Sequence, residues 1–155
     1  MELITLAHRI QGLMVRSGNP KSIKKIKDVA HKDVRFANRN PGSGTRLWFD
    51  AELKRLKMDA GKIRGYDQIA KTHTESASII EAGQADVALG LQAAARQHHL
   101  DFIPLFEERY DLVLPRENEE FVTPLLDYLQ TAAFRKELNS LTGYNTTHSG
   151  EQIIL

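Results

Sequence analysis

Short strand-like segments alternate with helix-like segments along this chain, and that alternation constrains its fold more than any other feature of the sequence. Apolar residues cluster as in strands over residues 3–15, 34–38, 63–66, 86–89, 102–105 and 112–114. They recur at helical spacing over 21–27, after 46, and over 72–83, 93–97, 121–130 and 131–138. Because such chains place helices on the faces of a parallel or mixed sheet, we expect an α/β fold.

Three of the expected helices begin at recognisable polar residues. One starts directly after the glycine-containing loop at residues 40–46. Thr72, followed three residues later by Glu75, forms a capping box at the start of another, and Thr131 caps the last helix. We expect Pro124 in the first turn of the helix before that one, where proline is tolerated.

The charges are divided unevenly between the two halves of the chain. Residues 1–65 hold 15 Lys and Arg against 6 Asp and Glu, a net charge of +9, whereas residues 66–155 hold 6 against 14, a net charge of −8. The basic half is suited to an anionic ligand or a phosphate backbone. The alternative is that the two halves pack together and neutralise each other.

Composition excludes several classes of protein. No uninterrupted apolar run approaches the ~20 residues needed to cross a bilayer. The N-terminal stretch at residues 3–13 is interrupted by His8, Arg9 and Gln11, so it does not read as a secretory leader, and we expect a cytoplasmic protein with no membrane partner. The absence of cysteine removes disulfides, thiolate nucleophiles and the common structural zinc sites.

The sequence contains no familiar catalytic or metal-binding pattern. The six histidines include no HExxH motif, and the adjacent His98 and His99 point apart in regular structure. The carboxylates within residues 107–111 could form an acid/base pair, but a solvated turn between two strands is the favoured interpretation. No serine lies in a GxSxG motif. We therefore expect a protein that is not an enzyme and that holds no metal and no cofactor.

The loop NPGSGTR at residues 40–46 is the sharpest local signal for a binding site. Its glycines allow a ligand to approach the backbone, Ser43 and Thr45 supply hydroxyl donors, and the following helix offers unpaired amides from Gly44 onward. Arg39 and Arg46 flank the loop with permanent positive charge. These groups predict a binding site for an oxyanion. The alternative is a glycine loop with a purely structural role.

A second candidate segment, KTHTESA at residues 71–77, places further hydroxyls at a helix start. Thr72, Thr74 and Ser76 are the candidate donors there. The capping box alone explains Thr72 and Glu75, so a binding role is expected only if the two loops converge.

Several motifs, in this order along the chain, carry a resemblance to a known family. They are RIQGLMV (9–15), GNP (18–20), NRNPGSGTR (38–46), GY (65–66), THTESASIIEAGQADVALG (72–90), LDFIPLFEERYDLVLPR (100–116) and FRKELNSLTGY (134–144). This pattern resembles the periplasmic-binding-protein-like domain of bacterial molybdate regulators and of MoeA-type molybdopterin proteins. It is similar, more distantly, to LysR-type effector domains and to molybdate- and tungstate-binding proteins of uptake systems.

The resemblance implies a type II periplasmic-binding-protein architecture. Residues 1–16 would be the hinge strand and a remnant of the first lobe, and residues 17–102 a complete three-layer α/β/α ligand-binding lobe with a mixed sheet. Residues 103–155 would be the return crossing strand and the C-terminal helices of a first lobe that is expected to be incomplete.

The resemblance also implies a non-catalytic function in which a small anion is bound. A molybdate- or tungstate-like oxyanion, or an anionic molybdopterin-related compound, would be bound on behalf of a regulatory or molybdenum-cofactor protein. The implied ligand-binding residues are Arg39, Ser43, Gly44, Thr45, Arg46, Thr72, Thr74, Ser76 and Tyr110. The alternative is a protein interaction or assembly module with a vestigial ligand cleft.

Two further expectations concern macromolecular partners. Nucleic-acid binding through this chain is not favoured, because the lysines of residues 21–32 are not interleaved with aromatics and no helix-turn-helix pattern is present. A homodimer is expected through the N-terminal strand and the C-terminal helices, with the NPGSGTR loop outside the interface.

Overall fold

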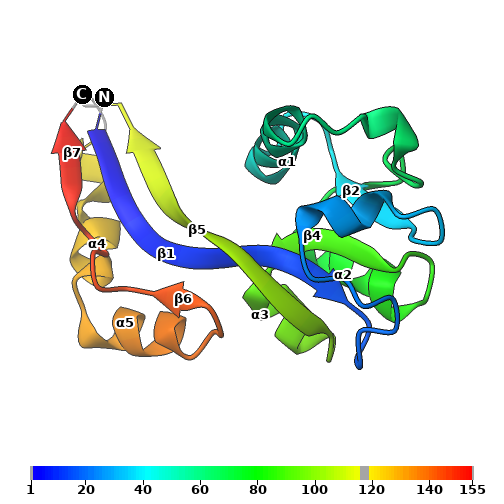
Figure 1. Ribbon diagram of the computed structural model, residues 1–155. Coiled ribbons are helices and arrows are strands. Elements are labelled where there is room, and N and C mark those ends of the chain that lie inside the picture. The colour runs from blue at the N-terminus through cyan, green and yellow to red at the C-terminus, as the bar shows by residue number, and fades with distance from the viewer. Residues whose placement is uncertain (1, 116–118, 155) are drawn as a thin grey trace. The chain divides into compact units, whose positions relative to one another are not determined.

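A computed structural model of the chain describes residues 2–115 and 119–154. The protein divides into two compact units. The central unit is Gln11–Leu105, and the terminal unit combines the residues up to Ile10 with those from Phe106 onward. Two long strands, β1 (Glu2–Val15) and β5 (Asp101–Leu114), contribute residues to both units (Figure 1).

The central unit is built on a mixed sheet, as the sequence predicts. Its strand order is β3-β2-β4-β1-β5, in which β2 is Phe36–Arg39, β3 is Ile69–Ala70 and β4 is Val87–Leu91. Strand β2 runs parallel to both β3 and β4, and β1 is antiparallel to β4 with Gln11 opposite Leu91. The carboxyl ends of β2, β3 and β4 therefore lie at the same edge.

Helices cover both faces of this sheet (Figure 1). They are α1 (Gly44–Arg55), α2 (His73–Glu81) and α3 (Gln92–Gln97). On the α1 face the ring of Phe36 stacks on Phe49 at 4.7 Å between centroids. On the opposite face Ala37 belongs to a buried cluster with residues of α2 and α3. Because successive strand residues point to opposite faces, β2 contributes side chains to the core on both sides of the sheet. The expected α/β/α architecture is confirmed.

Two predictions of local structure in the central unit are wrong. The helical turn expected over 21–27 is instead a 3-10 helix, η1 (Ile26–Ala30), and a second one, η2 (Ala60–Lys62), follows α1. The strand expected over 63–66 is a turn. Gly65 adopts a φ of +83°, and a Cβ there would lie 2.1 Å from the carbonyl oxygen of Phe36, so the chain bends before β3 begins.

The terminal unit packs two helices on the outer parts of β1 and β5. These are α4 (Glu119–Leu129) and α5 (Ala132–Asn139), followed by the short strands β6 (Tyr144–Asn145) and β7 (Gln152–Ile154). Both short strands pair antiparallel with β1. The small core of this unit is formed by Ile4, Leu114 and Leu129.

Two predictions for the terminal unit are also wrong. The solvated turn expected at residues 107–111 lies inside the single strand β5. Within the sheet, Glu108 forms an ion pair with Arg9, and Arg109 forms one with Asp111. Pro124 lies beyond the first turn of α4, which begins at Glu119.

No helix in the described parts of the chain combines the length and the apolar character needed to cross a membrane.

Candidate functional site

The two candidate loops converge at the carboxyl edge of the central sheet. Arg39 at the end of β2 is paired in register with Ala70 at the end of β3. Just beyond them, the amide of Asn40 donates to the carbonyl of Ala70 at 3.1 Å. The parallel register thus places the starts of α1 and α2 at one edge, where ligands of open α/β sheets bind.

The first loop forms a capped helix N-terminus. The Ser43 hydroxyl accepts a hydrogen bond from the amide of Arg46 at 3.2 Å, so Ser43 is the N-cap of α1. The amides of Gly44 and Thr45 precede the first intrahelical hydrogen bond and find no acceptor among the described residues. Gly44 is exposed to solvent. These two amides, at the positive end of the helix dipole, are donors suited to an anion.

The second loop forms the N-terminus of α2. The Thr72 hydroxyl accepts from the amide of Glu75 at 3.0 Å, and the Glu75 carboxylate accepts from the amide of Lys71 at 2.7 Å. The expected capping box is therefore half formed, because Glu75 bonds to Lys71 and not to Thr72. Thr74 is exposed, whereas Ser76 is fully buried and donates to the carbonyl of Thr72 at 3.1 Å. Thr74 alone of these has a side chain open to a ligand and no hydrogen bond within the described chain.

Arg39 lies between the two helix starts and is 9% exposed. One terminal nitrogen, Nη2, donates to the carbonyl of Lys71 at 3.1 Å. The other, Nη1, lies 3.0 Å from Nδ1 and 3.1 Å from Nε2 of His73. A buried, permanently charged guanidinium is thereby held at the carboxyl edge by contacts to the α2 loop.

Two other predicted site residues are engaged within the protein. Thr45, 4% exposed, donates its hydroxyl to the side-chain oxygen of the buried Gln11 at 2.9 Å. Arg46 donates from Nε to Asp50 at 2.9 Å, donates from Nη1 to the carbonyl of Arg39 at 3.1 Å, and stacks on the ring of Tyr66. These contacts attach α1 to β1 and β2.

The pKa values in this cluster follow from those contacts. Burial lowers the pKa of Arg46, but its hydrogen bonds to Tyr66 and Asp50 outweigh that effect and leave the pKa raised. Burial raises the pKa of Tyr66, and the hydrogen bond from its hydroxyl to Asp50, at 2.6 Å, raises it further against the opposing charge of Arg46. Arg46 is therefore a permanent structural cation.

Tyr110, the remaining predicted site residue, lies on β5. It belongs to the terminal unit, where its ring is 46% exposed and lies 3.9 Å from the guanidinium carbon of Arg9. Its contact with Arg9 is a cation–π interaction within that unit.

The sequence analysis missed three residues of the site: Gln11, His73 and Gly90. The sequence analysis gave His73 no role, yet it contacts Arg39. Gly90, near the end of β4, has no room for a side chain, because a Cβ there would lie 2.5 Å from Met14 and 3.5 Å from Nδ1 of His73. Gln11 and His73 lie 34 positions from Thr45 and Arg39, and Gly90 lies 17 positions from His73 and 76 from Met14, so no local pattern could have found them.

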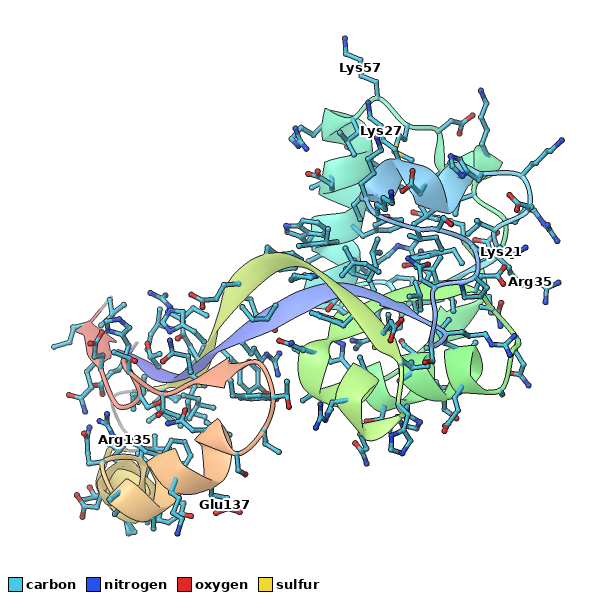
Figure 2. The ribbon with its side chains drawn as sticks, turned by 60° about the horizontal axis from the view of Figure 1, so that its bottom comes forward. Lys21, Lys27, Arg35, Lys57, Arg135 and Glu137 are labelled. Atoms are coloured by element: carbon cyan, nitrogen blue, oxygen red, sulfur yellow. The ribbon has the colours of Figure 1, made fainter. Side chains whose placement is uncertain are left out.

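Basic side chains cover the surface of the central unit. Its residues 11–105 hold 16 Lys and Arg against 10 Asp and Glu, a net charge of +6. Lys27, Arg35 and Lys57 are exposed and extend outward (Figure 2). The central unit keeps a net positive charge, which attracts small anions by long-range electrostatics.

No group of three or more His, Asp or Glu side chains that could hold a metal ion occurs within the described residues.

Comparisons with known proteins show which family has this architecture. The model of the PBP superfamily domain, the periplasmic-binding-protein superfamily, matches residues 1–130. The uncharacterized protein YvgK of Bacillus subtilis is 38% identical over 152 residues, 98% of this chain and 49% of that protein. A Clostridium pasteurianum protein, the uncharacterized protein in the ferredoxin 2Fe-2S gene 5′ region, is 35% identical over 108 residues, 68% of this chain and 96% of that protein.

Solved structures agree on the fold. PEB3 with bound L-phospholactate has a TM-score of 0.64 at 16% identity, over 92% of this chain and 68% of PEB3. A putative phosphate transporter substrate-binding protein from Clostridium perfringens, solved with bound phosphate, has a TM-score of 0.64 at 14% identity, over 89% of this chain and 69% of that protein. These are small-ligand-binding proteins with an open sheet and covering helices. The chain belongs to the periplasmic-binding-protein superfamily, and it spans about half the length of its Bacillus relative.

Proposed function

We propose that this protein binds a small oxyanion, without catalysing a reaction, at the carboxyl edge of its central sheet. The observation that carries the proposal is the convergence of two helix N-termini on the buried guanidinium of Arg39. The donors are the amides of Gly44 and Thr45, with the hydroxyl of Thr74 from the second loop. Such a set of donors stabilises negative charge without any nucleophile or acid/base pair.

The proposed ligand class is a tetrahedral oxyanion, either molybdate and tungstate or phosphate and its esters. Two structural neighbours hold phosphate or L-phospholactate, which supports an oxyanion ligand and favours the phosphate group. The resemblance to molybdate-responsive proteins keeps molybdate and tungstate among the candidates. In either case the bound anion would be reported to a regulatory or biosynthetic partner.

Calorimetric titration with phosphate, L-phospholactate, sulfate, molybdate and tungstate tests the proposal. The decisive variant is Gly44→Pro, because proline fits the first position of a helix but has no amide to donate. Losing one hydrogen bond to a charged ligand is expected to cost about 1.5–3 kcal/mol, which weakens binding at least tenfold. Gly44→Ala is the matched control, since it keeps the amide and a Cβ there meets nothing within 4 Å.

The alternative, a protein interaction module with a vestigial cleft, makes a different prediction. It is supported by two hydrogen bonds within the protein, from Thr45 to Gln11 and from Arg46 to Asp50. These bonds leave fewer donors for a ligand than the sequence indicates. If none of the five anions gives heat up to millimolar concentration, oxyanion binding is rejected and this alternative takes its place. If Gly44→Pro and Gly44→Ala bind the anion equally well, the ligand does not bind the amide at the start of α1.

A further inference from the structure

The amino edge of the central sheet, where β2 and β4 begin, brings a second set of charged residues together. Phe36, the first residue of β2, is paired in parallel register with Val87, the first residue of β4. The preceding residues, Arg35 and Asp86, therefore lie side by side. The amide of Arg35 donates to Oδ2 of Asp86, and the amide of Asp86 donates to the carbonyl of Arg35, each at 2.8 Å. Arg64 is held at the same edge, because its carbonyl accepts from the amide of Phe36 at 2.8 Å.

A pocket of about 210 Å³ lies at this edge, and charged side chains form most of its wall. Its lining residues are Lys21, Asp33, Arg35, Arg64, Gly83, Ala85 and Asp86. Figure 2 shows Lys21 and Arg35 on one side of the central unit. Arg16 reaches the rim, because its Nη1 lies 3.9 Å from the position that a Cβ on Gly83 would take. Four cationic side chains thus meet two acidic ones, a net charge of +2.

Main-chain carbonyls, and not carboxylates, hold the two central arginines of this pocket. Nη1 of Arg35 donates to the carbonyl of Gln84 at 3.1 Å, and Nη1 of Arg64 donates to the carbonyl of Lys32 at 2.9 Å. Neither guanidinium forms an ion pair with a described carboxylate, and each keeps Nε and Nη2 without an acceptor in those parts of the chain. A guanidinium that is oriented by one bond and has further donors in hand is suited to the oxygens of a phosphate group.

The two carboxylates of the pocket are occupied by other groups. Asp86 accepts the main-chain amide of Arg35, and Asp33 lies 3.7 Å from Nζ of Lys21. A positive charge therefore remains at the arginines, and a bound anion would neutralise it.

The wall and the size of the pocket indicate which anion it would take. The described wall contains no aromatic and no large apolar side chain, since its uncharged residues are Gly83 and Ala85. A nucleobase or a hydrocarbon group would find no surface to pack on. The volume is also below the roughly 300–1,000 Å³ of pockets that enclose drug-sized ligands. The pocket thus suits a compact anion with several charges, and the rest of a larger ligand would stay in solvent.

We propose that the pocket at the amino edge is a second anion-binding site, which takes the phosphate or diphosphate group of a small molecule. Arg35 and Arg64 provide the donors, and Arg16 and Lys21 add positive charge at the rim. Strand β2 separates this pocket from the oxyanion site, since Arg35 precedes the strand and Arg39 ends it. The inference goes beyond the proposed function and does not depend on it.

Amide NMR during titration with inorganic diphosphate tests the proposal, because it locates binding within this 17.5 kDa chain. We expect saturable shifts at the amides of Gly83, Ala85 and Asp86, and the same shifts at weaker affinity with inorganic phosphate. Arg35→Gln combined with Arg64→Gln should weaken binding at this pocket at least tenfold, because charge-assisted hydrogen bonds are lost. Both side chains are exposed, so this variant is expected to fold.

Lys27→Gln combined with Lys57→Gln is the matched control. It removes the same charge from exposed positions of the same unit that do not line the pocket (Figure 2). Its affinity should change less than about twofold at physiological ionic strength, because salt screens distant charges. Asp33→Asn should act in the opposite direction and raise the affinity about 1.5- to 5-fold, since it frees Lys21 and removes a repelling charge.

Several outcomes would overturn the proposal. One is the absence of saturable shifts at the pocket amides up to millimolar diphosphate, including shifts that occur at Gly44 and Thr45 alone, which would support the carboxyl edge only. Another is equal weakening by the two double variants, because the overall charge of the unit would then account for binding. If a short DNA duplex shifts the pocket amides and diphosphate does not, the pocket contacts a nucleic-acid backbone and the small-molecule ligand is rejected.

Discussion

The hydroxyl of Tyr66 joins α1 to the turn before β3 through its hydrogen bond to Asp50. Burial and this hydrogen bond both raise the pKa of Tyr66 above that of an unfolded chain. The protonated hydroxyl therefore adds stability that is fully present below about pH 10 and is lost as the pH rises through the higher folded-state value.

Tyr66→Phe is expected to reduce the free energy of unfolding by about 1 kcal/mol near neutral pH, because one hydrogen bond is lost. The difference from the unmodified protein should shrink as the pH rises above about 10. Urea unfolding at pH values from 7 to 11 measures both. Tyr144→Phe is the control, since the Tyr144 hydroxyl makes no hydrogen bond within the described residues. A difference that stays constant over this range would contradict the assignment.

A second residue-scale prediction concerns the buried pair Thr45 and Gln11. Thr45→Val keeps the shape of the side chain but removes the donor to Gln11, leaving a buried oxygen short of its hydrogen bond. We expect a loss of about 1–3 kcal/mol in the free energy of unfolding, with the anion affinity changed less than twofold. Chemical denaturation and calorimetry of the same variant check the two parts. A large loss of anion affinity with unchanged stability would show that the Thr45 hydroxyl binds the ligand, as the sequence analysis expected.

At this scale the sequence was informative about caps and less so about side-chain partners. Thr72 and Thr131 were recognisable as caps because a cap acts within four residues, whereas Ser43, predicted as a ligand donor, proved to be the N-cap of α1. Arg46 lies in the same loop motif, yet its role is decided by Tyr66, twenty residues later in the chain. Residue type and spacing predict donors, but they do not predict which donors the fold itself will use.

At the scale of secondary structure elements, the end of β4 packs closely against β1 and the start of α2. A Cβ on Gly90 would lie 2.5 Å from the terminal carbon and 3.0 Å from the sulfur of the buried Met14. Gly90→Ala is therefore expected to cost about 1–3 kcal/mol through overpacking and to weaken anion binding by displacing His73. Thermal unfolding and sulfate titration measure the two effects.

Gly44→Ala is the matched control for this prediction, because it also adds one methyl group at the carboxyl edge. Its Cβ meets nothing within 4 Å, so stability should change by no more than about 0.5 kcal/mol. If Gly90→Ala proves as stable as Gly44→Ala and binds equally well, the close packing of β4 against Met14 and His73 has no part in the site.

Element prediction succeeded where the signal was local and failed where pairing was distant. The helix α1 begins at the glycine loop, as its apolar spacing predicts. Strand β5 was divided in two because its charged middle is typical of a turn. In the structure those charges are paired within the sheet, and Glu108 meets Arg9 from 99 positions away. A short stretch of sequence around Glu108 does not include Arg9, so a local pattern could not predict this pairing.

At the scale of the whole molecule, the fold class could be predicted from the alternation of strands and helices and from the resemblance. The position of the candidate site depends instead on which strands pair and in which register. The parallel pairing of Arg39 with Ala70 is what brings the two loops together. The sequence analysis left that convergence open, since no motif specifies which strands become neighbours. The uneven division of charge between residues 1–65 and 66–155 was visible in the sequence, but the exposure of the basic side chains required the structure.

The expected homodimer would use the C-terminal helices, and the structure limits which of their side chains are available to a partner. Ile4 on β1 is fully buried and Leu129 on α4 is 2% exposed, so both belong to the core of the terminal unit. Leu126 packs against the same cluster. These side chains are therefore not available to a partner.

The opposite side of α4 carries an apolar stripe at helical spacing. Phe121 is 85% exposed, Leu125 42% and Tyr128 43%. Beside it lies a pocket of about 280 Å³, which Tyr128 lines together with Phe134, Leu138 and Leu141 of α5 and the following turn. Because an exposed apolar side chain and an apolar pocket lie on one surface, we expect a two-fold interface in which each copy inserts Phe121 into the pocket of the other.

We predict that the unmodified protein sediments at twice its monomer mass of 17.5 kDa at micromolar concentration. Phe121→Glu combined with Leu125→Glu should give a folded monomer, because both side chains are exposed and contribute little to the core of the terminal unit. Leu47→Glu is the control: it alters an exposed leucine in the central unit, 61% exposed, and should leave the dimer intact. A monomeric unmodified protein, or a dimer that survives both substitutions on α4, would refute this interface.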